Sequence, residues 1–263
     1  MVGSWKFVVP EKVGLHQVID ELNSPLKVLG LYILRLNAGK SKTIQFDDRE
    51  CGLFFISGQA ELDLNGVSGM FCSEDYAYAP VGQSFTIHSK SGETLVVMPT
   101  ARTSTIKQAF VRKYKDVVRE EDRHEIHGAL SFSRSILMYG GMDNEMARMA
   151  IGVTSGQDGS WTSWPPHEHG ETFEEIYYYF GMKPEGFGVH VILTGDEKES
   201  AYIIRNNCAI AIPHSYHPVV AAPGNRLKYL FVMGSKDKEK NPPSTYRQAA
   251  QIHPDFHKHD IQV

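Results

Sequence analysis

The segment WTSWPPHEHGETFEEIYYYF, residues 161–180, contains the pattern that decides both the fold and the site. His167 and His169 stand two positions apart, and alternate side chains of a β-strand share one face, so both imidazoles point the same way. A short polar turn, a pair of glutamates and a run of aromatic residues follow. Aromatic residues favour strands. We therefore expect a metal site at the mouth of a β-structure, with a strand rich in His and Glu as the structural alternative.

Similar short runs of apolar or alternating residues recur along the chain, including KVLGLYILRL, TLVVMP, GFGVHVILT and LKYLFVMG, and they are bounded by turn residues. Repeated strands at this spacing predict an all-β sandwich or barrel. Convincing helical stretches are rare, and the best candidates are GLHQVIDELN (14–23) and PSTYRQAAQIH (243–253). The charged, turn-like segment near residues 105–125 is the expected linker.

The two halves of the chain share a pattern. EDYAYAPVGQSFTI (74–87) and NNCAIAIPHSYHPV (206–219) each contain an alternating strand, a proline, a turn and a second strand. Upstream of these, DRECGLFFISGQAELDL (48–64) parallels TFEEIYYYFGMKPEGFGVHV (172–191). The similarity is weak but is repeated in the same order, so we expect a duplicated β-barrel.

The second half can assemble a mixed set of nitrogen and oxygen ligands. His167 and His169 on one face can chelate one divalent cation, and His217, which follows the strand CAIAIP, is the obvious third imidazole. With a glutamate from the next strand, such a set suits Zn, Mn, Fe or Ni better than Mg or Ca.

Only one of the two glutamates can join this set, because consecutive residues of a strand face opposite ways. Glu175 shares its face with Tyr177 and Tyr179, whose hydroxyls suit a polar pocket. Glu174 shares the more apolar face, which suits packing against a second sheet or domain. We expect Glu175 to be the ligand, and a bulge or a different turn would transfer the role to Glu174.

The first half lacks the equivalent residues. KSKTIQF stands where the second half has its two histidines, and Ser84 falls near the position of His217 when Pro80 is aligned with Pro213. We expect a metal site in the second barrel and a scaffold role for the first.

The remaining histidines have weaker patterns. His253, His257 and His259 belong to the tail HPDFHKHD, which is typical of a weak, adventitious metal binder. His124 and His127 lie in the charged connector and are expected at the surface, with a lid role as the alternative.

Composition narrows the class of protein. The 263 residues are 41% hydrophobic and 22% charged with a net charge of −4, which argues against a nucleic-acid partner. The N-terminal segment lacks the pattern of a signal peptide, and no apolar run approaches the roughly 18 residues that span a membrane. Cys51, Cys72 and Cys208 are odd in number and widely spaced, so we expect buried free thiols in a reducing compartment. A cytoplasmic protein without a membrane partner is the expectation.

The ordered motifs WTSWPPHEHGE, FEEIYYY, GFGVHV, IPHSYHPVVAAPG and LKYLFVMG make the chain resemble the 5-deoxy-glucuronate isomerase family of inositol catabolism, whose members are bicupins. The resemblance is strong over residues 145–236 and looser over 25–102. It implies two tandem double-stranded β-helix (jelly-roll) barrels: an N-terminal cupin barrel without metal over 1–104, and a C-terminal cupin barrel with metal over 105–263.

The resemblance also implies a ligand set. Related 4-deoxy-L-threo-5-hexosulose-uronate ketol-isomerases bind zinc through an HxH, Glu and His arrangement. Carried over residue by residue, this arrangement falls on His167, His169, Glu175 and His217, and zinc is the first expected metal. Two features depart from the family pattern: the loop GETF after His169 is short, and His190-Val191 stands where members carry Gln-Arg.

The implied reaction is the aldose–ketose isomerisation of 5-deoxy-glucuronate to 2-deoxy-5-keto-gluconate, in which a proton moves between C1 and C2. His190, Tyr177, Tyr179 and His214 are the candidates for carrying that proton, and the sequence does not rank them. Arg205 or Lys183 is the candidate cation for the substrate carboxylate.

Three alternatives stay open at this point: the sister ketol-isomerase, another metal-cupin enzyme such as an Fe(II) dioxygenase, and a non-catalytic sugar-binding cupin. The expected partner is a small-molecule sugar acid. A homo-oligomer is expected because edge strands of bicupins often pair between subunits.

Overall fold

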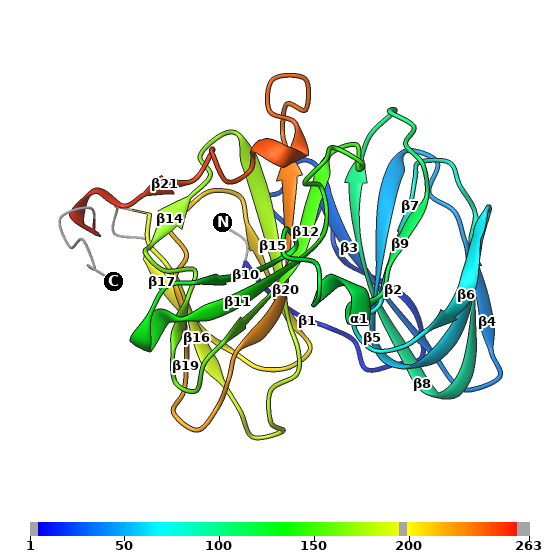
Figure 1. Cartoon of the computed structure of the whole chain (residues 1–263), viewed down its shortest axis with the longest axis horizontal. Helices are drawn as coiled ribbons and strands as arrows, with labels where there is room; N and C mark the ends of the chain where they lie inside the picture. Colours follow the sequence, from blue (N-terminus) through cyan, green and yellow to red (C-terminus); the bar gives the residue numbers. More distant parts are fainter. Residues whose placement is uncertain (1–4, 195–198, 257–263) are drawn as a thin grey trace.

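The computed structural model describes residues 5–194 and 199–256, and they fold almost entirely into β-strands. The strands gather in two lobes that lie side by side, the first half of the chain in one and most of the second half in the other (Figure 1). Helical structure within the described residues is limited to α1 (Tyr114–Val117) and three short 3-10 turns: η1 (Leu130–Phe132), η2 (Pro243–Thr245) and η3 (Pro254–Phe256). The all-β class is confirmed.

The first lobe is built on one main sheet with the strand order β2-β3-β8-β5-β7-β9. The strands β5 and β8 are long and continue into a second layer, where β4 pairs with β8 and β6 pairs with β5. The bounds are β2 (Gly14–Ile19), β3 (Leu29–Leu36), β4 (Ser41–Ile44), β5 (Arg49–Leu64), β6 (Val67–Phe71), β7 (Tyr76–Ala79), β8 (Phe85–Arg102) and β9 (Phe110–Arg112). Buried side chains such as Phe55 and Phe85 fill the space between the layers.

The second lobe has a seven-stranded sheet, with the order β1-β18-β15-β20-β12-β11-β10, and a four-stranded sheet, with the order β13-β19-β16-β17. A further short pair joins β14 to β21. The bounds are β1 (Lys6–Val8), β10 (His124–His127), β11 (Arg134–Gly140), β12 (Met149–Gly156), β13 (Trp161–Thr162), β14 (His167–Glu168), β15 (Phe173–Tyr179), β16 (Gly188–Ile192), β17 (Ser200–Ile204), β18 (Cys208–Ile212), β19 (Val219–Ala221), β20 (Lys228–Ser235) and β21 (Gln251–Ile252).

The two lobes repeat the same strand order. The path β9-β7-β5-β8-β3-β2 corresponds strand by strand to β1-β18-β15-β20-β12-β11, and β4-β8-β5-β6 corresponds to β13-β19-β16-β17. Two short strands join the sheet of the lobe that does not follow them in the chain: β1 precedes the first lobe but pairs with β18 of the second, and β9 precedes the second lobe but pairs with β7 of the first. The expected linker near 105–125 therefore contains β9, α1 and the start of β10.

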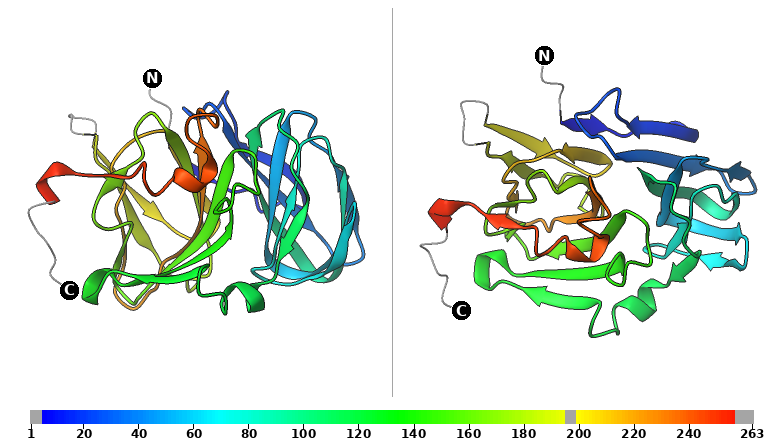
Figure 2. Two further views of the ribbon diagram at one scale, coloured as in Figure 1. Left: turned by 45° about the horizontal axis from the view of Figure 1, so that its top comes forward. Right: turned by 90° about the horizontal axis from the view of Figure 1, so that it is seen from above.

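The face of the large sheet that is turned toward the first lobe is apolar. Ile176 and Tyr178 of β15 belong to a core that also includes Phe54 and Tyr139, whose rings meet edge to face with centroids 5.3 Å apart. The opposite face of β15 carries Tyr177 and points into the interior of the second lobe. Two further views show the lobes packed along this sheet (Figure 2).

Both helix predictions are wrong. Residues 14–19 form β2, which pairs with β3, and the chain turns after it; in this segment Leu22 is 96% exposed, so it adds nothing to an apolar face. Within 243–253 only the turn η2 is helical, because the segment continues as β21 and pairs with β14.

The cysteine prediction is correct in part. Cys51 and Cys208 are buried and free, whereas Cys72 is exposed because it lies in the turn between β6 and β7. Within the described ranges, no helix is long and apolar enough to cross a membrane.

Candidate metal centre

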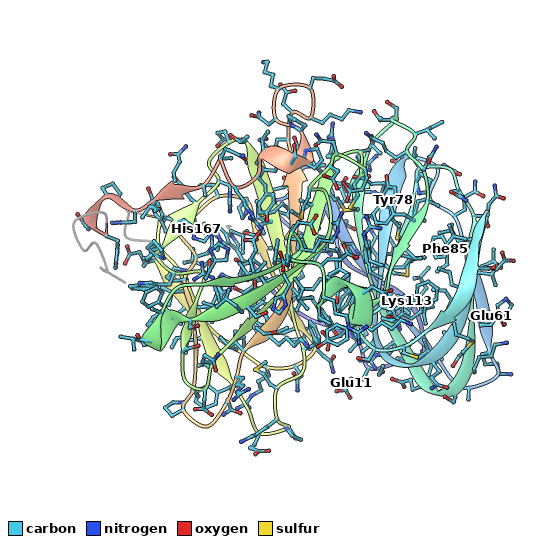
Figure 3. All side chains as sticks on the ribbon, viewed as in Figure 1. Glu11, Glu61, Tyr78, Phe85, Lys113 and His167 are labelled. Carbon is cyan, nitrogen blue, oxygen red and sulfur yellow. The ribbon has the colours of Figure 1, made fainter. Side chains whose placement is uncertain are left out.

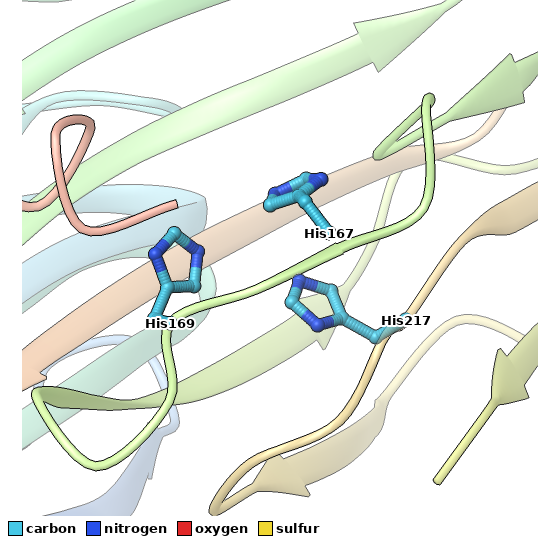
Figure 4. Close-up of side chains that lie close together, drawn as sticks. All are labelled: His167, His169 and His217. Carbon is cyan, nitrogen blue, oxygen red and sulfur yellow. The ribbon is translucent and has the colours of Figure 1, made fainter. Parts of the chain in front are cut away.

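Three imidazoles meet inside the second lobe. His167, on β14, and His169, just after it, come from the HxH motif, and His217 lies between β18 and β19. One ring nitrogen of each lies within 4.8 Å of those of the other two. Figure 3 places His167 in the second lobe, and Figure 4 shows the three rings facing a common space. Among the described residues, this is the group of histidine, cysteine and acidic side chains with the spacing of a metal site.

Backbone carbonyls hold two of these rings in place. Nδ1 of His167 lies 3.0 Å from the carbonyl oxygen of Pro165, and Nδ1 of His217 lies 2.8 Å from that of Ser215. A carbonyl oxygen can only accept, so each Nδ1 carries the hydrogen and donates it. The lone pair of each ring is then on Nε2, the arrangement typical of histidine ligands.

Glu175 reaches the same space. Its Oε2 lies 3.1 Å from Nε2 of His217 and 3.9 Å from Nε2 of His169. Within the described residues, these Glu175 and His217 atoms and Nδ1 of His169 are buried without a hydrogen-bond partner. Buried polar atoms without partners are costly, and a cation between them would satisfy both the carboxylate and the imidazoles. The residues therefore fit a divalent metal.

Glu174 points the other way. Its carboxylate accepts hydrogen bonds at 2.6–2.8 Å from the backbone N–H groups of Lys27, Val28 and Leu29 in the first lobe. The alternation of β15 thus directs one glutamate to the histidines and the other to the lobe junction.

Burial controls the protonation of the centre. It lowers the pKa of His167 to about 3, with a smaller contribution from electrostatic interaction with His217, and it lowers the pKa of His169 well below its ordinary value. Burial also raises the pKa of Glu175, although the neighbouring ring of His217 opposes this. Burial therefore favours the neutral form of His167 and His169 near pH 7, which is the form that binds a metal.

A cavity of about 300 Å³ opens beside the centre. His167, His169 and Glu175 form part of its wall, and the rest of the lining includes aromatic residues such as Trp164 and Tyr246. The C-terminal segment borders it, because β21 pairs with β14 in the register Ile252 to His167. The cavity has the size and mixed lining of a small-molecule site.

The four predicted proton carriers occupy three different places. Tyr177 lines the cavity. Tyr179 and His190 are buried outside its lining, and the Tyr179 hydroxyl lies 2.7 Å from Nδ1 of His190. His214 is exposed, and the structure does not bring it to the cavity.

The two predicted cations also lie elsewhere. Arg205 is exposed and donates to the backbone carbonyls of Glu185 and Gly186, each at 3.0 Å. Lys183 donates to the carbonyl of Gly224 at 2.8 Å. The cations that line the cavity are Arg134 and Arg247, which sequence reasoning missed because no motif or spacing marks either one.

The other histidines are placed as follows. His124 is partly buried, with Nε2 3.0 Å from the Ser135 hydroxyl, whereas His127 is partly exposed and lines the cavity. The ring of His253 packs on Tyr216 at a centroid distance of 4.6 Å. His257 and His259 lie outside the described residues.

Comparison with solved structures defines the class of fold as cupin-like. The Bacillus subtilis oxalate decarboxylase OxdC superposes with a TM-score of 0.64 and 13% identity, over 90% of this chain and 78% of that one. An IolB-like protein from Salmonella typhimurium LT2 superposes with a TM-score of 0.77 and 19% identity, over 88% of this chain and 93% of that one.

The chain belongs to the KduI/IolB family, whose family model matches residues 7–244. Among its curated relatives is the 5-deoxy-glucuronate isomerase of Lacticaseibacillus casei. It is 21% identical to this chain, over 84% of this chain and 86% of the relative.

Proposed function

We propose that this protein is a metal-dependent aldose–ketose isomerase that converts 5-deoxy-glucuronate to 2-deoxy-5-keto-gluconate, a step of myo-inositol catabolism. The observation that carries the proposal is the meeting of His167, His169, His217 and Glu175 beside a cavity of small-molecule size. Membership of the KduI/IolB family and the name of the Lacticaseibacillus casei relative support an isomerase.

The proposed architecture is a bicupin, with a metal-free barrel over residues 1–104 and a metal-binding barrel over 105–263. The identical strand order of the two lobes supports the duplication. The histidine group within the described residues belongs to the second lobe, which supports one metal site per chain.

Zinc is the proposed metal, because three imidazoles and one carboxylate form a ligand set typical of this ion, and Mn, Fe or Ni would also fit the set. Among the structural neighbours, the Bacillus subtilis oxalate decarboxylase is described as having Mn(II) centres. When bound, the metal supplies a Lewis acid that polarises the carbonyl and hydroxyl oxygens of the substrate.

Tyr177 is the proposed proton carrier. It is the one member of the four candidates in the cavity wall. Burial and the negative charge of Glu175 hold its pKa well above the ordinary value, so its hydroxyl keeps a proton near pH 7 and can donate to a substrate oxygen. Tyr179 and His190, which are joined by a hydrogen bond outside the cavity lining, are proposed to support this side of the barrel.

A cytoplasmic location is proposed, since the structure has free cysteines that suit a reducing compartment. A homo-oligomer is proposed on the same grounds as for other bicupins, whose edge strands are available for pairing.

The test is an assay of the purified protein after its metal content has been measured. We expect ketose formation from 5-deoxy-glucuronate, at the same rate with and without oxygen, and loss of activity after chelation. If the protein isomerises only 4-deoxy-L-threo-5-hexosulose-uronate, it is the related ketol-isomerase instead. A metal-containing protein that isomerises neither uronate would contradict the proposal.

A further inference from the structure

The charge of the cavity wall is asymmetric. Two guanidinium groups, Arg134 and Arg247, line the cavity, whereas Glu175 is the one carboxylate among the lining residues that the structure describes. Glu175 faces the histidines and Arg247 is paired with Glu125, so Arg134 is the cavity arginine without a carboxylate partner among the described residues. Its uncompensated charge favours an anionic ligand at this wall.

Arg134 is anchored beside the metal centre. It is the first residue of β11 and pairs across the strands with His127 of β10. Its Nη1 donates to the carbonyl oxygen of Trp164 at 2.9 Å, three residues before His167. The hydrogen bonds that Arg134 makes to described residues all start at Nη1, so Nε and Nη2 are available for a ligand.

Arg247 is oriented by a short network of side chains. Its Nε donates to the Tyr246 hydroxyl at 2.8 Å, and its Nη1 donates to Oε1 of Glu125 at 2.7 Å. The other oxygen of Glu125 lies 2.5 Å from Nε2 of His127. Glu125 is thus held between His127 and Arg247, and within the described part of the chain Nη2 of Arg247 stays free for a ligand.

We propose that Arg134 and Arg247 form a carboxylate-binding subsite that selects sugar acids over neutral sugars, and that Glu125 is the positioning residue for Arg247. This inference deepens the proposed function and rests on it for the assignment of the ligand as a sugar acid. Guanidinium groups suit the task because their planar donors match the two oxygens of a carboxylate. The metal centre then faces the reacting end of the sugar, and the arginines hold its acid group.

Binding of D-glucuronate and D-glucose to the purified full chain, measured by isothermal titration calorimetry, tests the subsite without requiring turnover. These sugars differ by a carboxylate in place of a hydroxymethyl group. We expect the wild type to bind glucuronate about 10-fold or more tightly than glucose, and Arg134→Gln or Arg247→Gln to weaken glucuronate binding by about 10- to 100-fold. Glucose binding should not change in either variant.

Two further variants separate charge recognition from general damage. Arg205→Gln removes an exposed arginine outside the cavity and should leave both affinities unchanged. Glu125→Gln should lower the preference for glucuronate in the wild-type background but have no further effect in Arg247→Gln, because it acts through that arginine. Arg247→Lys, which keeps the charge but loses the planar donors, should give an intermediate loss and covers the case in which Arg247→Gln fails to fold.

The subsite is wrong if the wild type does not discriminate between the two sugars, or if the arginine variants bind glucuronate as the wild type does. The proposal is also wrong if the arginine variants lose affinity for glucuronate and for glucose to the same extent. Selective glucuronate binding by a protein that isomerises no uronate would contradict the proposed function alone. Isomerase activity with unchanged selectivity in the arginine variants would contradict the subsite alone.

Discussion

Glu50 and Glu174 make the same contact in opposite directions across the junction of the two lobes. They occupy equivalent positions at the start of β5 and β15, and each is buried. Each carboxylate accepts hydrogen bonds from three consecutive backbone N–H groups of the other half: Lys27, Val28 and Leu29 for Glu174, and Ala147, Arg148 and Met149 for Glu50. Glu50 also accepts one from the Tyr78 hydroxyl at 2.6 Å. These reciprocal contacts attach β15, the strand that carries Glu175, to the first lobe.

Replacing either carboxylate should destabilise the protein. In Glu50→Gln or Glu174→Gln, an amide group that carries two hydrogens of its own would face a set of donors. We expect the free energy of unfolding to fall by about 2–4 kcal/mol in each variant, measured by chemical denaturation.

The control for these variants is Glu61→Gln, which removes a carboxylate paired with Lys90 at the surface, where both side chains are about half exposed. Surface pairs of this kind contribute little to stability, because solvent screens them. If Glu50→Gln or Glu174→Gln unfolds at the same denaturant concentration as this control, the reciprocal contacts do not stabilise the junction of the lobes.

The sequence predicts the strands better than the helices, because alternation is a local property whereas packing is not. In GLHQVIDELN, the residues Leu15, Val18, Ile19 and Leu22 have the spacing of a helical face. The structure buries Val18 and Ile19 and leaves Leu22 exposed, because pairing with β3 imposes the conformation of a strand. Tertiary pairing therefore overrides the local pattern.

The candidate site was predictable to the extent that strand alternation defines it. The period of two places His167 with His169 and separates Glu174 from Glu175, and both arrangements are properties of the local chain. The same period places Tyr177 and Tyr179 on one face of the strand, but it does not indicate how far each lies from the cavity. It therefore could not show that, of these two, Tyr177 lines the cavity.

The arginines were not predictable for a different reason. Arg134 reaches the cavity from the first residue of β11, and Arg247 reaches it from the segment between η2 and β21. The proximity of Arg247 to the histidines depends on the pairing of β21 with β14, and that of Arg134 depends on its hydrogen bond to the Trp164 carbonyl. Both contacts join distant segments, and no sequence pattern indicates them.

Removing one imidazole should release the metal. We expect His217→Ala to contain less than about a tenth of the wild-type metal, because His217 is buried and shares the site with two other rings. Elemental analysis by mass spectrometry measures this directly. His214→Ala is the matched control, since it removes an exposed histidine three residues away and should keep the full metal content. Equal metal in both variants would rule out His217 as a ligand.

Removing the Tyr177 hydroxyl should slow turnover. Tyr177→Phe retains the ring, which stacks on Tyr229 at a centroid distance of 4.3 Å, but it loses the hydroxyl in the cavity wall. We expect kcat to fall by about 100-fold or more with a small change in KM, as for the loss of a proton carrier. Tyr179→Phe is the comparison: its hydroxyl bonds His190 outside the cavity lining, so its kcat should fall less. If kcat falls more in Tyr179→Phe than in Tyr177→Phe, Tyr179 is the proton carrier instead.

The metal-free protein should lose stability as the pH falls below about 6.5. Burial holds the pKa of His190 well below its ordinary value, whereas in the unfolded chain the same ring has a pKa of about 6.5. Below that pH the unfolded chain binds a proton that the folded chain does not, so acid favours unfolding, and one such histidine contributes up to about 1.4 kcal/mol per pH unit.

Urea denaturation between pH 7.5 and 5 in the presence of a chelator measures this dependence. His190→Gln should show a shallower slope than the wild type, because Gln cannot titrate but its amide oxygen can accept the Tyr179 hydrogen bond. His214→Gln, which removes an exposed imidazole, is the control for the substitution itself. If the free energy of unfolding depends on pH equally in the wild type and in His190→Gln, the buried ring takes up a proton in the folded protein. His190 would then be a charged group inside the second lobe.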